Sequence, residues 1–119
     1  MQVTNAEWKI MDLLWEKPRT ITQITAALTG ETGWSKHTVI TLLKRMQEKD
    51  TVYFEEGEKA KLYFPKVSRE DAELHESDEF LNKVFHGKVA LMLDTMVKNN
   101  NISEKDIDAI CEILKLKKE

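Results

Sequence analysis

The sequence predicts a mainly α-helical protein with one small β-hairpin, arranged as three helices, the hairpin and three further helices. Two observations support this fold class. Apolar residues recur at the three- and four-residue spacing of amphipathic helices over most of the chain. Only residues 52–65 show the two-residue alternation of strands. We expect residues 1–67 to form one domain and residues 68–119 to form a second, all-helical domain.

The charge of the chain is unevenly distributed. The 119 residues carry a formal net charge of −3, but residues 1–70 hold 11 Lys+Arg against 10 Asp+Glu, whereas residues 71–119 hold 7 against 11. Because no general basic excess exists, any nucleic-acid surface must be a local patch.

Export and membrane insertion are not expected. Charged residues interrupt the apolar N-terminal segment, so it lacks a signal-peptide pattern. The longest uninterrupted apolar run, Val89–Leu93, is too short to cross a bilayer. Cys111 is the only cysteine, which rules out a disulfide within one chain, and its place on an apolar stripe predicts a buried thiol. We expect a cytoplasmic protein.

Start and stop signals delimit the first two helices. Thr4 and Glu7 form a predicted capping box for the first helix, and the proline that follows this helix stops it because proline lacks the necessary N–H. Thr20 or Thr22 can cap the second helix. Residues 29–33 are predicted to be a turn, with its two glycines as hinges.

The third helix has two distinct faces. It is predicted to begin at Ser35, a favoured N-cap residue. Its apolar residues follow the helical template and form a buried seam, which consists of Val39, Leu42, Leu43 and Met46. At about 100° per residue, the opposite face carries His37, Thr41, Lys44 and Glu48, flanked by Thr38, Ile40 and Arg45. Residues 35–49 hold four cations and one anion, which is unusual for a solvated helix face.

Residues 52–65 are predicted to form a β-hairpin. Two apolar pairs are expected to face inward, each around a tyrosine that faces outward: Val52 and Phe54 around Tyr53, and Leu62 and Phe64 around Tyr63. Gly57 lies in the loop between the strands, and Pro65 ends the second strand.

Three helices are predicted in the C-terminal half. Gly87 closes the first of them, and Ser103 with Asp106 caps the last. Three short helices in roughly 50 residues cannot bury so much apolar surface within one chain, so we expect a symmetric homodimer. The residues expected at its interface are Leu81, Val84, Phe85, Leu91, Met92, Met96, Ile107, Ile110 and Leu114.

Three helices followed by a hairpin are typical of the winged helix-turn-helix, in which the third helix enters the major groove of DNA. The length of the turn at residues 29–33 also favours the winged form. Hydroxyl and imidazole groups at the start of the helix suit base edges, and the later cations suit phosphates. The hairpin mixes cations, which attract phosphates, with Glu55, Glu56 and Glu58, which repel them. The sequence therefore favours neither the presence nor the absence of a contact between the hairpin and DNA. The DNA-binding candidates are Ser35, Lys36, His37, Thr38, Thr41, Lys44, Arg45, Lys59 and Lys61.

Enzyme and metal sites are not expected. The spacing of His37, His75, His86 and Cys111 matches no zinc pattern. The sequence also has no glycine-rich phosphate loop, no nucleophile elbow and no HExxH motif. We therefore expect neither catalysis nor a cofactor.

Five stretches in order carry a resemblance to a known family. They are AEWKIMDLLW, GWSKHTVITLLKRMQEKD, KLYFPKVSRED, ESDEFLNKVFHG and NISEKDIDAICEIL. Together they cover nearly the whole chain, which resembles the BlaI/MecI/CopY family of bacterial repressors. The resemblance implies a winged-helix domain, a helical dimerisation domain and repression of a resistance operon through a pseudo-palindromic operator.

The resemblance places the base-reading positions of the family on His37, Thr38 and Thr41. Relatives often carry lysine at the position of His37 and a polar residue at that of Ile40. Ile40 has two interpretations: it contacts a thymine methyl group, or it packs against Tyr53 or Tyr63.

The family uses two kinds of inducing signal. In the penicillinase branch, a membrane sensor reports β-lactam, and a protease acting downstream cuts the repressor in its dimerisation domain. The resemblance places the Asn–Phe cleavage position of that branch on Thr95–Met96, where this chain departs from the family pattern. In the copper branch, a C-terminal pair of cysteines binds Cu(I), and Cys111 alone cannot supply that pair. The penicillinase branch is therefore favoured. The alternatives are a copper-responsive repressor of the same family and a winged-helix module that binds protein rather than DNA.

Overall fold

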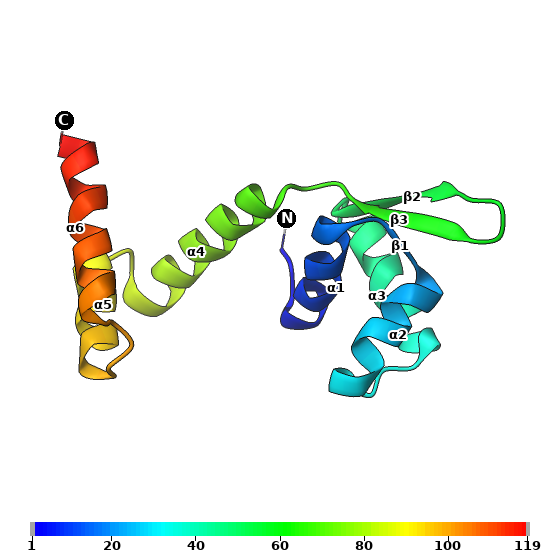
Figure 1. Cartoon of the computed structure of the whole chain (residues 1–119), viewed down its shortest axis with the longest axis horizontal. Helices are drawn as coiled ribbons and strands as arrows, with labels where there is room; N and C mark the ends of the chain where they lie inside the picture. Colours follow the sequence, from blue (N-terminus) through cyan, green and yellow to red (C-terminus); the bar gives the residue numbers. More distant parts are fainter. Residues whose placement is uncertain (1, 119) are drawn as a thin grey trace. The chain divides into compact units, whose positions relative to one another are not determined.

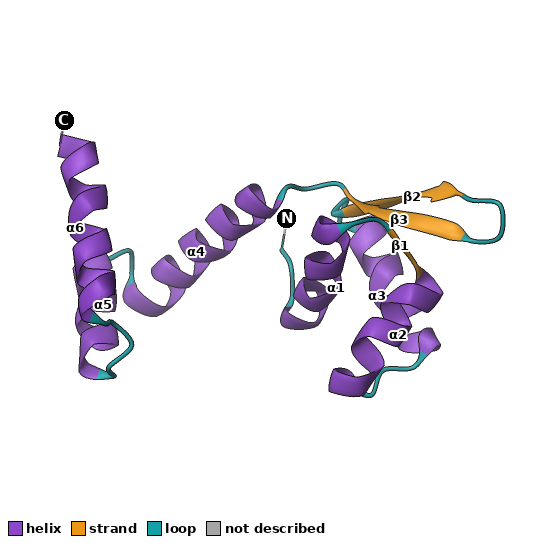
Figure 2. Cartoon of the chain, viewed as in Figure 1, coloured by secondary structure: helices purple, strands orange, loops and turns teal. Residues whose placement is uncertain are grey.

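The computed structural model describes residues 2–118, and Figure 1 shows the order of the elements. In chain order they are α1 (Asn5–Glu16), β1 (Arg19–Thr20), α2 (Ile21–Thr32), α3 (Lys36–Glu48), β2 (Val52–Glu56), β3 (Lys61–Pro65), α4 (Arg69–Phe85), α5 (Val89–Lys98) and α6 (Glu104–Lys118). The predicted fold class is confirmed: helices dominate, and the strands form one small sheet (Figure 2).

Two compact units divide the chain, one up to Ser77 and the other from Asp78 onward. The division falls inside α4, so this helix contributes its first turns to the N-terminal unit. The boundary between residues 67 and 68 stays a prediction.

The first helix is fixed by the expected capping box. The Thr4 amide donates to Glu7 Oε1 at 3.1 Å, and the Glu7 amide donates to Thr4 Oγ1 at 3.2 Å. Both donors would otherwise lack a partner at the helix start. The helix ends at Glu16, ahead of Pro18.

The second helix is longer than predicted. Of the two candidate caps, Thr20 takes the position, in a capping box with Gln23. The helix continues to Thr32 and ends at Gly33, whose φ of 72° is left-handed. The predicted turn at residues 29–33 is therefore wrong for residues 29–32, because a helix tolerates Gly30 in its interior. The connection to α3 is short, so the winged form rests on the hairpin and not on the turn length.

The sheet has three antiparallel strands in the order β1-β3-β2. Cross-strand pairing places Phe54 opposite Tyr63 and Tyr53 opposite Phe64, and opposite residues share a face of the sheet. Tyr63 is only 5% exposed and faces the core with Phe54. The predicted phase of β3 is therefore wrong, since Leu62 and not Tyr63 lies on the outer face. Large side chains that can pack in a core lie on both faces of β3, Leu62 and Phe64 on one and Tyr63 on the other, so alternation alone cannot decide which face points inward.

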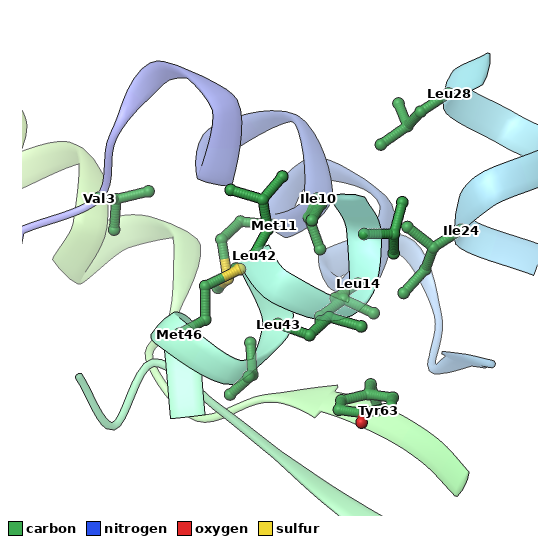
Figure 3. Close-up of a cluster of buried hydrophobic side chains, with 12 residues drawn as sticks. Val3, Ile10, Met11, Leu14, Ile24, Leu28, Leu42, Leu43, Met46 and Tyr63 are labelled. Atoms are coloured by element: carbon green, nitrogen blue, oxygen red, sulfur yellow. The ribbon is translucent and has the colours of Figure 1, made fainter. Parts of the chain in front are cut away.

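The core of the N-terminal unit lies between its three helices and the sheet. In Figure 3, apolar side chains from α1, α2 and α3 meet Tyr63 of β3. The buried set is Val3, Ile10, Met11, Leu14, Ile24, Leu28, Val39, Leu42, Leu43, Met46, Val52 and Tyr63. The seam predicted for α3 is thus confirmed as its core face.

The C-terminal unit is helical and buries little. A left-handed Gly87 (φ 79°) ends α4, and its amide donates to the Leu81 carbonyl at 3.1 Å. Ser103 and Asp106 cap α6 through reciprocal bonds of 2.9 and 3.2 Å. Within the described residues, α5 and α6 contain no buried side chain. No helix of residues 2–118 has the length and apolarity needed to span a membrane.

Candidate nucleic-acid interface

Two features fix the orientation of α3: the cap at its start and the buried residues along its length. At its start, Ser35 caps the helix, and its Oγ accepts from the Thr38 amide at 3.3 Å. Along its length, Val39, Leu43 and Met46 are fully buried in the core. Because these residues repeat at helical spacing, the opposite face must point away from the unit.

That outward face is polar and cationic, and we call it the α3 face. Its exposed cationic and hydrogen-bonding members are Ser35, Lys36, His37, Lys44 and Arg45, while Thr38 and Thr41 are half-buried. The exposed Glu48 is the one anion on this side of α3. Among residues 2–118, no ion pair engages the two lysines or the arginine of this face. The α3 face thus brings together all seven of the DNA-binding residues predicted on this helix.

The hydroxyl groups of this face are already oriented. Thr41 Oγ1 donates to the His37 carbonyl at 3.0 Å, so it can act toward a ligand only as an acceptor. Exocyclic amino groups of adenine and cytosine are the matching donors in the major groove. The hydroxyls of Ser35 and Thr38 lie 3.3 Å apart and form a second polar pair at the start of the helix.

Lys49, the fourth cation of the segment, does not belong to the α3 face. Its ammonium donates to both carboxylate oxygens of Glu7, at 2.8 and 3.0 Å, and to the Gln2 carbonyl at 3.1 Å. The local sequence shows no sign of this role, since Glu7 lies 42 positions away.

The hairpin carries the two remaining candidates. Lys59 is exposed in the loop between β2 and β3, and Lys61 is exposed at the first position of β3. The Lys61 ammonium lies 4.3 Å from the centre of the Phe54 ring, a cation–π contact. The hairpin and the α3 face belong to the same compact unit.

Ile40 lies beside the α3 face. Its side chain is 42% exposed, and it is not among the residues packed against the core. Tyr63, one of its two predicted packing partners, is buried, and Tyr53 stacks on Phe64 at 5.1 Å. An exposed apolar side chain therefore adjoins the polar groups of the face.

The predicted interface residues of the C-terminal unit are all incompletely buried. Val84, Leu91, Ile107 and Leu114 are exposed large apolar side chains, and the others are half-buried: Leu81, Phe85, Met92, Met96 and Ile110. Between α5 and α6 lies an apolar hollow that is lined by Leu93, Val97, Ile102, Ile107, Ile110 and Cys111. The prediction of a buried thiol is wrong for the single chain, since Cys111 is exposed.

The Thr95–Met96 bond lies inside α5. Thr95 is exposed, Met96 is half-buried, and Thr95 Oγ1 donates to the Leu91 carbonyl at 3.0 Å. In the part of the chain that the structure describes, no three or more His, Cys, Asp and Glu side chains are grouped to hold a metal ion.

The fold and the exposed α3 face together define a winged-helix protein. The chain is similar in structure to the adhesin competence repressor AdcR of Streptococcus pyogenes, with a TM-score of 0.52 and 18% identity over 99% of this chain and 81% of that one. It is also similar to a mutant form of ZitR from Lactococcus lactis, with a TM-score of 0.51 and 16% identity over 98% and 73%. These similarities support the fold alone.

Residues 3–116 match the family model described as penicillinase repressor, and the chain belongs to this family. The methicillin resistance regulatory protein MecI of Staphylococcus aureus is 26% identical over 117 residues, covering 98% of this chain and 95% of the relative. The penicillinase repressor of Bacillus licheniformis is 25% identical over 114 residues, covering 95% and 89%. The predicted family is thereby confirmed, and it is a family of transcriptional repressors rather than enzymes.

Proposed function

We propose that the protein is a homodimeric repressor that binds a pseudo-palindromic operator of a resistance operon and responds to β-lactam. The observation that carries the proposal is the α3 face, a set of oriented hydroxyls and of cations that form no ion pair within residues 2–118, opposite a buried apolar seam. Such a face offers both base readout and phosphate contact from one helix.

The residues of the α3 face and the two hairpin lysines divide into groups with different proposed contacts to DNA. His37, Thr38 and Thr41 contact base edges in the major groove. Ser35 and Lys36 lie at the positive end of the α3 dipole, which favours a phosphate. Further along the helix, Lys44 and Arg45 contact phosphates, and Lys59 and Lys61 contact the backbone beside the groove.

Dimer formation is supported by the exposed apolar residues of the C-terminal unit. Val84, Leu91 and Ile107 are each exposed by more than two fifths. A second copy would remove such side chains from water, and two symmetric reading helices would match two half-sites one turn of DNA apart. In sedimentation velocity, we expect a dimer for the wild type and a monomer for Val84→Glu combined with Ile107→Glu. Lys105→Glu, an exposed polar position on α6, serves as the control and should stay dimeric.

Release by proteolysis at Thr95–Met96 is the proposed response to the signal. Proteases bind extended backbone, so α5 must open locally before this bond can be cut. In cells treated with a β-lactam, mass spectrometry should detect a fragment that ends at Thr95. An intact repressor under full induction would exclude this route and would leave DNA binding unaffected.

DNA binding is tested by fluorescence anisotropy with a palindromic operator and a scrambled duplex. We expect the affinity for both to fall steeply with salt, because phosphate contacts release counterions. The double variant His37→Ala and Thr41→Ala should lose mainly the preference for the operator. Thr25→Ala is a matched control, since Thr25 Oγ1 donates to the Ile21 carbonyl at 2.8 Å just as Thr41 does to His37.

The outcomes separate the two classes of function. A preference that disappears only in the His37/Thr41 variant supports readout by the α3 face. If the wild type binds neither duplex at low salt, the repressor proposal fails, and the same face should be tested against proteins.

A further inference from the structure

The segment that joins β3 to α4 is tied to the winged-helix unit. The Lys66 amide donates to the Thr51 carbonyl at 2.8 Å, and the Trp15 indole N–H donates to the Val67 carbonyl at 3.0 Å. These bonds hold the backbone immediately before α4 against β2 and α1. The chain therefore enters α4 at a fixed point of this unit.

The first turn of α4 is held as well. The Arg69 guanidinium lies 4.7 Å from the centre of the Trp15 ring, and its Nη2 lies 3.2 Å from Asp12 Oδ1. One turn later Ala72 is buried, whereas Leu74 is exposed. Asp12 and Trp15 on α1 thus contact the first turn of α4, and we call Asp12, Trp15 and Arg69 the α1–α4 clamp.

Because the clamp lies at the first turn of α4, a small change of angle there produces a large displacement at the far end of the helix. A helix of 17 residues such as α4 is about 25 Å long, so a tilt of about 10° at its first turn displaces its far end by about 4 Å. One base pair spans about 3.4 Å along DNA, so such a tilt corresponds to about one base pair of spacing.

We propose that Asp12, Trp15 and Arg69 are positioning residues that fix the direction in which α4 leaves the DNA-binding unit. They thereby set the separation between half-sites that the dimer accepts. This inference rests on the proposed function, because it requires a dimer that binds two half-sites. The three residues do not touch DNA in this role; they act through the direction of α4.

The alternative is that the clamp only stabilises the fold. A purely structural role would lower the stability of the unit, and it would weaken binding equally at every half-site separation. A positioning role would leave a single half-site unaffected and would change only the selectivity among separations. Spacing selectivity is therefore the decisive measurement.

The test uses the full-length protein and duplexes in which the half-site separation is optimal or changed by one or two base pairs. Arg69→Ala removes both the stacking and the ion pair, and its side chain is 49% exposed, so the unit should still fold. We expect its spacing selectivity to fall by about fivefold to tenfold, with unchanged affinity for a duplex that holds one half-site. Trp15→Phe keeps a ring but removes the bond to Val67, and it should act in the same direction.

Asp12→Asn has a matched control in Glu31→Gln. Both changes turn a carboxylate into an amide and break an exposed ion pair made by α1, but Glu31 pairs with Lys9 and binds α1 to α2. Asp12→Asn should reduce spacing selectivity by about twofold to fivefold, and Glu31→Gln should leave it unchanged.

Three results would decide against the clamp. Wild-type selectivity in Arg69→Ala, an equal loss at all separations, or an equal effect of Glu31→Gln would each overturn the positioning role. Failure of the wild type to bind any operator is a different result, and it would overturn the proposed function itself.

Discussion

The ammonium of Lys49 lies 2.8 and 3.0 Å from the two carboxylate oxygens of Glu7, so the end of α3 is bound to the first turn of α1. The Glu7 carboxylate is 2% exposed and also accepts the Thr4 amide of its own capping box. One buried charge thus joins the cap of α1 to the far end of the helix that carries the α3 face.

Removing the lysine should strongly destabilise the N-terminal unit. Lys49→Met leaves a buried carboxylate without its cation, at an expected cost of about 2 to 3 kcal/mol in the free energy of unfolding. This is below the cost for a fully buried pair because the Lys49 side chain is 34% exposed. Lys66→Met breaks the exposed pair with Asp50 and should cost at most about 0.5 kcal/mol. Urea denaturation compares them, and equal losses would contradict a special role for Glu7.

Two glycines should respond to alanine in opposite directions. Gly30 lies inside α2, and a Cβ added there meets no atom within 4 Å. Gly30→Ala should therefore stabilise the protein by about 0.5 to 1 kcal/mol. Gly87 has a φ of 79°, and its added Cβ would lie 3.2 Å from Asn82 Oδ1, so Gly87→Ala should destabilise by about 1 to 2 kcal/mol. Thermal unfolding of both variants checks the signs.

Ile40 should recognise a thymine methyl group in the operator. Its exposed side chain lies about 60° around the helix from His37, beside the polar groups that read bases. Replacing one operator thymine at a time by deoxyuridine removes single methyl groups. At one thymine of each half-site, we expect the wild type to lose about 1 kcal/mol, or about fivefold in affinity. Ile40→Ala should lose nothing further there; an unchanged penalty in this variant would exclude the contact.

Tyr63 should make the protein sensitive to alkali. Burial, followed by the nearby Glu56 carboxylate, raises the pKa of the Tyr63 phenol above its ordinary value of 10.0. The unfolded chain then loses this proton first, so the contribution to stability is complete below about pH 10 and falls as the pH rises toward the folded pKa. Tyr63→Phe should reduce the loss of unfolding free energy above about pH 10, and Tyr53→Phe on the exposed face should not. Equal slopes for the two variants would contradict this assignment.

Features set by local sequence were predictable. The cap at Ser35 and the seam of Val39, Leu42, Leu43 and Met46 follow from residues within one helix, and both are observed. The outward direction of the α3 face follows from that seam. Both Thr20 and Thr22 are residue types that cap helices, and Gln23, three residues after Thr20, completes the capping box that selects Thr20.

Features set by distant residues were not predictable in the same way. Strand β1 has only two residues and exists because it pairs with β3. The inward direction of Tyr63 depends on its pairing with Phe54, and the role of Lys49 depends on Glu7. Cys111 lies on an apolar stripe that none of the described residues buries. Each case depends on contacts between residues that are distant in the sequence, and the spacing of apolar residues along the chain does not reveal such contacts.

The lack of buried side chains among the described residues of α5 and α6 makes repression depend on the concentration of the chain in the cell. In the proposed dimer, a second chain covers the apolar side chains that one chain leaves exposed on these helices, so their stability follows mass action and depends on how many copies a cell holds. Below the dissociation constant of the dimer, the concentration of DNA-binding species rises with the square of the chain concentration. A modest fall in synthesis, or in the amount of intact chain, would then produce a disproportionate fall in operator occupancy. Repression would therefore be lost over a narrow range of chain concentration.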